Sequence, residues 1–172
     1  MLSQRGRYAL KAMIDLARCG APARQVSAIA AEENIPRKFL EGIMSELRNA
    51  GLVTSARGKM GGYRLARSPD LITFGEIIRL TDGPLALIPC ASRNFYRRCD
   101  DCRDETACAL RRIMVLVRNE VSDILDQTTL ADALADGAIV QDALGECDDD
   151  PLKCAGAFSP RGPSQRGDEE AI

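Results

Sequence analysis

The residues of this chain best suited to chemistry are four cysteines within nineteen positions, Cys90, Cys99, Cys102 and Cys108. Eight, two and five residues separate them, and five charged residues lie between positions 100 and 105. Because so polar a stretch is a poor environment for apolar packing, metal ligation explains the thiols better. Four thiolates suit a [2Fe–2S] or [4Fe–4S] cluster, and they suit tetrahedral zinc equally well. A Cys99–Cys102 dithiol that simply oxidises is a further alternative.

The rest of the composition narrows the classes of protein. The chain of 172 residues contains no His, so a metal site must use Cys, Asp, Glu or backbone ligands, and the commonest general base is missing. Seven cysteines without an export leader favour reduced thiols in a cytoplasmic protein over a disulfide framework. No apolar run is long enough to span a membrane. Outside the cluster, we expect Cys19 to be a small buried hydrophobe, and Cys147 and Cys154 to be incidental exposed thiols.

The overall charge of −2 hides a division along the chain. Residues 1–67 carry a net charge of +7, and residues 68–172 carry −9. A basic first third predicts a nucleic-acid partner, and the acidic remainder would oppose indiscriminate binding to polyanions.

Apolar residues at helical spacing predict three helices in that basic third, over residues 5–18, 26–33 and 36–49. Ser3 and Ser27 are the expected caps of the first two, and Pro36 suits the first position of the third. This order is typical of a helix-turn-helix, although a small helical bundle would also fit. The residues expected to face inward are Ile29, Ala30, Phe39, Leu40, Ile43, Met44 and Leu47.

A β-hairpin is predicted directly after these helices. Residues 52–55 and 63–66 alternate like strands around the basic, glycine-rich turn 57–62. A hairpin at this point makes a winged helix, in which the glycines would let the backbone approach DNA and an arginine would enter the minor groove. A phosphate-binding glycine loop fits less well, because the G-x-x-x-x-G-K-S/T spacing is missing.

Beyond the wing, the chain divides into four segments. Residues 68–89 predict a linker helix with Thr73 as cap and Glu76 at the capping-box position, and residues 90–108 form the cysteine loop. Residues 109–135 predict a long helix and a docking turn, with Leu130 and Leu134 facing inward, and residues 136–172 an acidic, largely disordered tail. The apolar stripe of the long helix consists of Leu110, Ile113, Met114, Val117, Val121, Ile124 and Leu125. This stripe could pack on its own domain, but a homodimer is favoured because a small DNA-reading module usually needs two half-sites.

Three stretches resemble one family of bacterial regulators. They are R-G-R-Y-A-L-K-A-M near the start, F-L-E in the third helix, and L-x-x-A-G-L-V-x-S-x-R-G-x-x-G-G-Y-x-L through the wing. The family includes the iron–sulfur cluster regulator IscR, the nitric-oxide-sensitive repressor NsrR and the rhizobial iron regulator RirA, and the resemblance covers about residues 1–135. It implies a homodimeric winged-helix repressor or activator, often with a cysteine-ligated cluster.

The resemblance also implies roles for particular residues. Lys38 and Glu41 would lie at base edges and Arg57 in the minor groove, while Gly42 replaces a longer polar residue of some relatives. The full set of expected DNA contacts is Arg7, Ser27, Arg37, Lys38, Glu41, Arg48, Arg57, Lys59 and Arg64.

For the cluster, Cys90, Cys102 and Cys108 match the three cysteines typical of cluster-binding relatives, and Cys99 is additional. Some relatives complete the site with His or a carboxylate. This chain has no His, and Tyr8 stands where a carboxylate occurs in some relatives. Cys99 is therefore the candidate fourth ligand.

We therefore expect a mainly α protein with a small β-hairpin wing, made of a winged helix-turn-helix domain and a long dimerisation helix. Its function would be that of a homodimeric repressor that binds a double-stranded DNA operator, with no membrane partner and no small-molecule substrate. An Fe–S cluster would control the affinity in response to iron, redox state or nitric oxide. Zinc or a thiol/disulfide switch is the alternative control. An Fe–S electron carrier or enzyme is a distant third reading, because no nucleotide-binding loop is evident and no His is available as a base.

Overall fold

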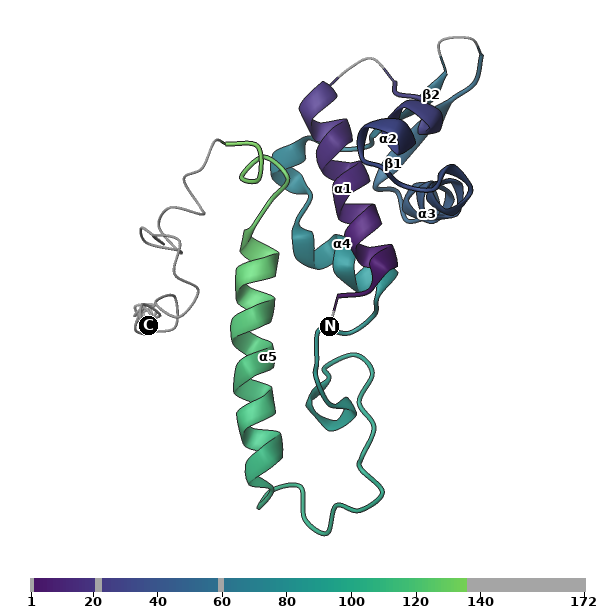
Figure 1. Ribbon diagram of the computed structural model, residues 1–172. Helices are drawn as coiled ribbons and strands as arrows, with labels where there is room; N and C mark the ends of the chain where they lie inside the picture. The colour runs from purple at the N-terminus through teal and green to yellow at the C-terminus, as the bar shows by residue number, and fades with distance from the viewer. Residues whose placement is uncertain (1, 21–22, 59–60, 136–172) are drawn as a thin grey trace, which may run out of the picture. The chain divides into compact units, whose positions relative to one another are not determined.

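The computed structural model describes residues 2–20, 23–58 and 61–135 (Figure 1). The expectations for residues 136–172, including Cys147 and Cys154, and for Lys59 lie outside the described residues. The elements in chain order are α1 (Gln4–Cys19), α2 (Val26–Glu32), α3 (Arg37–Asn49), β1 (Val53–Ala56), β2 (Gly62–Leu65), the short 3₁₀ helix η1 (Pro69–Leu71), α4 (Phe74–Thr81), the 3₁₀ helix η2 (Pro89–Ala91) and α5 (Ala109–Gln127). The mainly α winged-helix architecture is thus confirmed, and none of the described helices has the length and apolar character needed to cross a membrane.

The first helix, α1, begins where the sequence predicts. The Ser3 hydroxyl accepts a hydrogen bond from the Gly6 amide at 3.0 Å, which satisfies one of the free amides at the helix start. One side of α1 packs on α3, and the Tyr8 and Phe39 rings meet edge to face with centroids 5.8 Å apart. The expectation that Phe39 faces the core is wrong, because its side chain stays 48% exposed beside Tyr8 at the edge of the interface.

The pair α2 and α3 forms the helix-turn-helix. The predicted inward residues other than Phe39 are buried, and Asn34 makes the turn with φ of 52°. Two capping expectations are wrong. Ser27 lies inside α2, which begins after Gln25, and its hydroxyl lies 3.4 Å from the Gln25 side-chain oxygen. Pro36 occupies the position before the first helical residue of α3, because its ψ of 118° is extended.

The wing is a two-stranded antiparallel hairpin that is fastened to the helices at Arg24. Val53 pairs with Leu65 and Ala56 with Gly62, and beyond them Arg24 and Tyr63 exchange two backbone hydrogen bonds of 2.8 Å. A Cβ atom on Gly62 would lie 2.4 Å from the Arg24 carbonyl carbon and oxygen. Gly62 is therefore required for this backbone contact within the protein, independently of any approach to DNA.

The Arg24 side chain connects α1 to α2. It lies 2.9 Å from the carboxylate of Asp15, which is completely buried in α1, and 3.7 Å from Glu32. Burial raises the pKa of Asp15, and the Arg24 guanidinium opposes that shift. The Arg24 guanidinium also contacts the Cys19 thiol. The expectation that Cys19 is buried is wrong, because it is exposed at the end of α1.

The chain after α5 returns to the core beside α4. The Thr73 hydroxyl caps α4 by accepting from the Glu76 amide at 3.2 Å, as predicted, but the Glu76 carboxylate accepts from Arg67 at 2.6 Å. Leu130 is fully buried and Leu134 packs against the same core, so the predicted docking turn is confirmed.

Asp82 joins the end of α4 to the start of α1. Its carboxylate accepts hydrogen bonds of 2.6 Å from both the amide and the hydroxyl of Ser3. Burial alone would raise the pKa of Asp82, but these bonds favour the charged form and bring the pKa below its ordinary value of 3.8. A lowered pKa adds stability above 3.8, and that stability is lost as the pH falls through the lower folded-state value.

We expect Asp82→Asn to lower the free energy of unfolding by roughly 1–2 kcal/mol near neutral pH. An asparagine side chain is uncharged and has only one oxygen to accept the two hydrogen bonds that Ser3 donates. Urea unfolding followed by circular dichroism at several pH values measures this difference. The gap between wild type and variant should shrink as the pH falls below 3.8. A gap that stays constant across that range would contradict the role given to the ionised carboxylate.

Candidate functional site

The outer face of α3 carries the residues expected to meet DNA bases. Arg37 and Glu41, one helical turn apart, form an exposed ion pair of 2.9 Å. Lys38 lies exposed beside them, and no hydrogen bond or ion pair of its ammonium is found within the described residues. The space over Gly42 is open, so the missing side chain leaves a gap in this face. In the unbound chain Lys38 is thus available, whereas Glu41 is already paired.

The other expected DNA contacts are Arg48 of α3 and residues of the wing, α1 and α2. Arg48, at the end of α3, donates to Ser45 and Asn49 at 3.3 Å. Arg64 donates across the hairpin to Thr54 at 3.2 Å, and Arg57 is exposed in the wing turn. Arg7 is exposed on α1, and Ser27 is exposed on α2. Since α3 packs on β1, the helix that carries Lys38 and the wing lie side by side (Figure 1).

The cysteine loop begins and ends on ordered elements. Cys90 lies in η2 and is only 4% exposed. Cys108 is the residue that precedes α5, and its sulfur accepts a hydrogen bond from the Arg111 amide at 3.4 Å. Between them the chain forms an irregular loop that ends at the start of α5 (Figure 1). Two of the four thiols are therefore fixed by secondary structure, and two lie on the loop.

The four thiols are gathered closely enough to influence one another. A hydrogen bond with Cys90 raises the pKa of the Cys99 thiol, and partial burial adds to the shift. Burial raises the pKa of Cys102, as do the neighbouring thiols of Cys108 and Cys99. Within the described residues, no three Cys, Asp or Glu side chains are already arranged so that they could hold a metal ion. The thiols thus fit a thiophilic metal in donor type and grouping, and binding would require deprotonation and a rearrangement of the loop.

Two arginines of α5 join this loop to the helix. In the sequence they are notable only as residues outside the apolar stripe. The Arg111 guanidinium donates to the Cys90 carbonyl at 3.1 Å, and Arg118 donates to the Ala91 carbonyl at 2.6 Å. Both bonds end on η2, so α5 holds the backbone of a candidate ligand directly. A charge-assisted hydrogen bond is roughly twice as strong as a neutral one.

A helix that packs only on its own domain turns its apolar side towards that domain, but much of the apolar side of α5 is exposed. Polar side chains face the chain, including Arg111, Arg118 and Asp126, and Asp126 accepts two bonds of 2.5 and 2.7 Å from Arg79 of α4. None of the residues of α5 is buried. The large apolar side chains left exposed on this helix are Leu110, Ile113, Leu116, Val121 and Ile124. Exposed apolar side chains gathered on one helix in this way are typical of an interaction surface.

A helix-turn-helix followed by a β-hairpin wing, with basic residues on both, defines a winged-helix DNA-binding protein. The family model described as "Rrf2: Iron-dependent Transcriptional regulator" matches residues 2–136. This chain belongs to the Rrf2 family of transcriptional regulators. It is therefore a DNA-binding transcriptional regulator, and the relatives it matches are named as regulators rather than as enzymes.

Three relatives illustrate the range of the family. An rrf2-like HTH-type transcriptional regulator of Rhodobacter capsulatus is 42% identical over 141 residues, which are 80% of this chain and 94% of that protein. The structure of CymR, the global cysteine regulator of B. subtilis, is 39% identical with a TM-score of 0.65, over 77% of this chain and 95% of that one. The structure of IscR from T. potens is 32% identical with a TM-score of 0.63, over 82% and 90% of the two chains.

Proposed function

We propose that this regulator is a homodimeric repressor whose affinity for its operator is set by an Fe–S cluster on Cys90, Cys99, Cys102 and Cys108. The observation that carries the proposal is the gathering of these four thiols at the start of α5, together with the bonds from α5 to the Cys90 segment. The family description as iron-dependent and the similarity to IscR support iron over zinc.

The four thiolates would supply the whole ligand set from one chain. Cys90 and Cys108 come from ordered elements and would anchor it, while Cys99 and Cys102 lie on the intervening loop, which can adjust. A bound cluster would supply chemistry that responds to iron supply, oxidants and nitric oxide. Residues of the protein would then carry the change from the cysteine loop to the DNA-binding helices.

A change in the loop would reach the DNA-binding face through a short series of contacts. Arg111 and Arg118 couple the Cys90 segment to α5, and the Asp126–Arg79 pair couples α5 to α4. The packing of α4 on α1 and of α1 on α3 completes the series. In the proposed dimer each subunit contributes one α3 helix to the operator. A small rotation of α5 would alter the distance between these two helices and therefore their match to the two half-sites.

A thiol switch is the second candidate, because the Cys99 thiol already contacts Cys90. CymR of B. subtilis is named as the global cysteine regulator, and the S. aureus CymR structure is described as an oxidized form. In this alternative an oxidant such as a peroxide would take two electrons from the Cys90 and Cys99 thiols, which would lose their protons and form a disulfide in place of the cluster. The disulfide would act on α5 through the same arginines.

Anaerobic purification tests the choice of cofactor. We expect a visible absorption band with iron and sulfide bound, and we expect Cys99→Ser to lose most of the band because the chain has no His to replace the thiolate. Cys19→Ser, which changes an exposed thiol outside the loop, is the matched control. Colourless protein with one zinc per chain after reconstitution would refute the cluster, and a full band in Cys99→Ser would refute Cys99 as ligand.

Arg57 tests the wing. We expect Arg57→Ala to weaken operator binding and to reduce the slope of log affinity against log salt by about 1, because one cationic contact is lost. Fluorescence anisotropy with an operator duplex selected from a random-sequence library measures both quantities. Arg112→Ala, which removes an exposed arginine of α5, should leave both unchanged. An unchanged affinity in Arg57→Ala would place the wing outside the interface.

The apolar face of α5 tests the dimer. Ile113 is 54% exposed, and a second copy of α5 would bury it. We expect Ile113→Glu to shift the protein from dimer to monomer in sedimentation velocity, because burying an unpaired carboxylate is unfavourable. Arg112→Glu introduces the same charge next to it, off the predicted apolar stripe, and should remain dimeric. Wild-type protein that sediments as a monomer would refute the proposal outright.

A further inference from the structure

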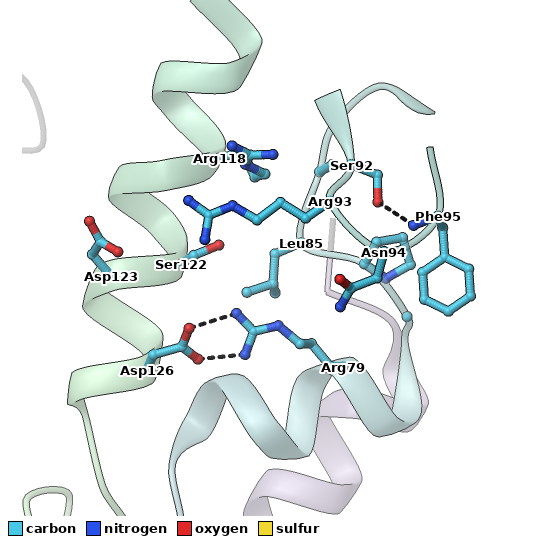
Figure 2. Close-up of a pocket in the computed structure, with 13 residues that line it drawn as sticks. Arg79, Leu85, Ser92, Arg93, Asn94, Phe95, Arg118, Ser122, Asp123 and Asp126 are labelled. Atoms are coloured by element: carbon cyan, nitrogen blue, oxygen red, sulfur yellow. Dashed lines mark hydrogen bonds and ion pairs between the residues drawn. The ribbon is translucent and has the colours of Figure 1, made fainter. Parts of the chain in front are cut away.

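A cavity of about 270 Å³ lies between α4, the segment 83–95 and α5 (Figure 2). Its walls include Arg79, Leu85, Ser92, Arg93, Arg118 and Ser122. Neither the four loop cysteines nor Arg111 are among the residues that line it, so the cavity is separate from the proposed cluster site. Its volume is slightly below the range of about 300–1,000 Å³ of cavities that take drug-sized ligands, and it therefore suits a small molecule.

Three arginines, Arg79, Arg93 and Arg118, and two carboxylates, Asp123 and Asp126, line this cavity, so one positive charge is in excess. Arg79 is paired with Asp126 by two hydrogen bonds at one side of the cavity. For Arg93 and Arg118, by contrast, the described residues provide no carboxylate within ion-pair distance. Both instead donate to the neutral amide oxygen of Asn119, Arg93 at 3.2 Å and the Nε of Arg118 at 3.1 Å.

The two unpaired guanidinium groups lie close together. Burial lowers the pKa of Arg118, and the nearby charges of Arg93 and Arg111 lower it further. Figure 2 shows the Arg93 side chain extending across the cavity towards α5, where its guanidinium group lies next to Ser122 and near Arg118. Two guanidinium groups without a carboxylate partner among the described residues, placed beside a hydroxyl donor, favour the binding of an anion, although the Asp123 carboxylate also lines the cavity.

We propose that this cavity binds a small organic oxyanion, a carboxylate or phosphate compound, between Arg93, Arg118 and the Ser122 hydroxyl. The planar guanidinium fork matches two oxygens of either group. The carbon part of the ligand packs against Leu85, whose side chain points into the cavity (Figure 2). Arg118 also holds the Ala91 carbonyl, so the oxyanion would stabilise the same arrangement of the Cys90 segment.

Isothermal titration calorimetry on the full-length protein tests this site, with succinate and inorganic phosphate as probes and sodium chloride to keep the ionic strength constant. We expect saturable binding with a Kd below about 1 mM for at least one probe, and a rise in Tm with its concentration. Binding of succinate alone identifies a carboxylate ligand, binding of phosphate alone a phosphate ligand, and binding of both the shared oxyanion chemistry.

Arg93→Gln should weaken the binding at least about tenfold, because a charged donor at the anion is lost. Arg112→Gln removes an exposed arginine that does not line the cavity and should bind as wild type does. Ser122→Ala should also weaken binding, and it provides the test if Arg93→Gln fails to fold. The proposal is overturned if neither probe binds, or if Arg93→Gln and Arg112→Gln weaken the binding equally. Unchanged affinity in both Arg93→Gln and Ser122→Ala would also overturn it.

Discussion

The hydrogen bonds from Arg111 and Arg118 to the carbonyls of Cys90 and Ala91 are the contacts on which the regulatory half of this protein depends. They bind a candidate metal ligand to the helix that carries the apolar face. Besides these bonds, η2 packs on α5, and Arg93 donates to Asn119 of α5 at 3.2 Å. Through the bond from Arg111, the backbone of Cys90 is joined directly to α5, and in the proposed mechanism the two shift together.

A second constraint follows from the first. Because guanidinium and carboxylate groups make most of the contacts from α5 to the chain, Leu125 packs against the core while five large apolar side chains of α5 are left exposed. Burying that face against a second copy removes apolar area from water at about 25 cal/mol per Å². The polar contacts that hold the loop and the exposed apolar residues proposed to meet a second copy thus belong to the same helix.

The sequence predicted the architecture because its determinants are local. Apolar spacing and the Ser3 and Thr73 caps place α1, α4 and most of the helix-turn-helix, and the glycine-rich turn places the wing. Burial at helix ends was less predictable. Phe39 continues an apolar stripe but stays 48% exposed beside Tyr8, and Cys19 is exposed at the end of α1.

The hydrogen bonds that join the cysteine segment to α5 could not be predicted from sequence patterns. Arg111 and Arg118 bind backbone carbonyls 21 and 27 residues away, and every residue carries such a carbonyl. The four cysteines were recognised from spacing because thiols are few, but their mutual contacts needed the fold.

Operator affinity before and after anaerobic removal of the cluster, in wild type and Arg111→Met, tests the central claim most directly. Arg111→Met removes the bond to the Cys90 carbonyl while leaving all four cysteines in place, and Arg112→Met is its neighbour control. The account predicts that cluster removal changes wild-type and Arg112→Met affinity at least about tenfold and changes Arg111→Met affinity much less. An equal change in all three proteins would contradict it.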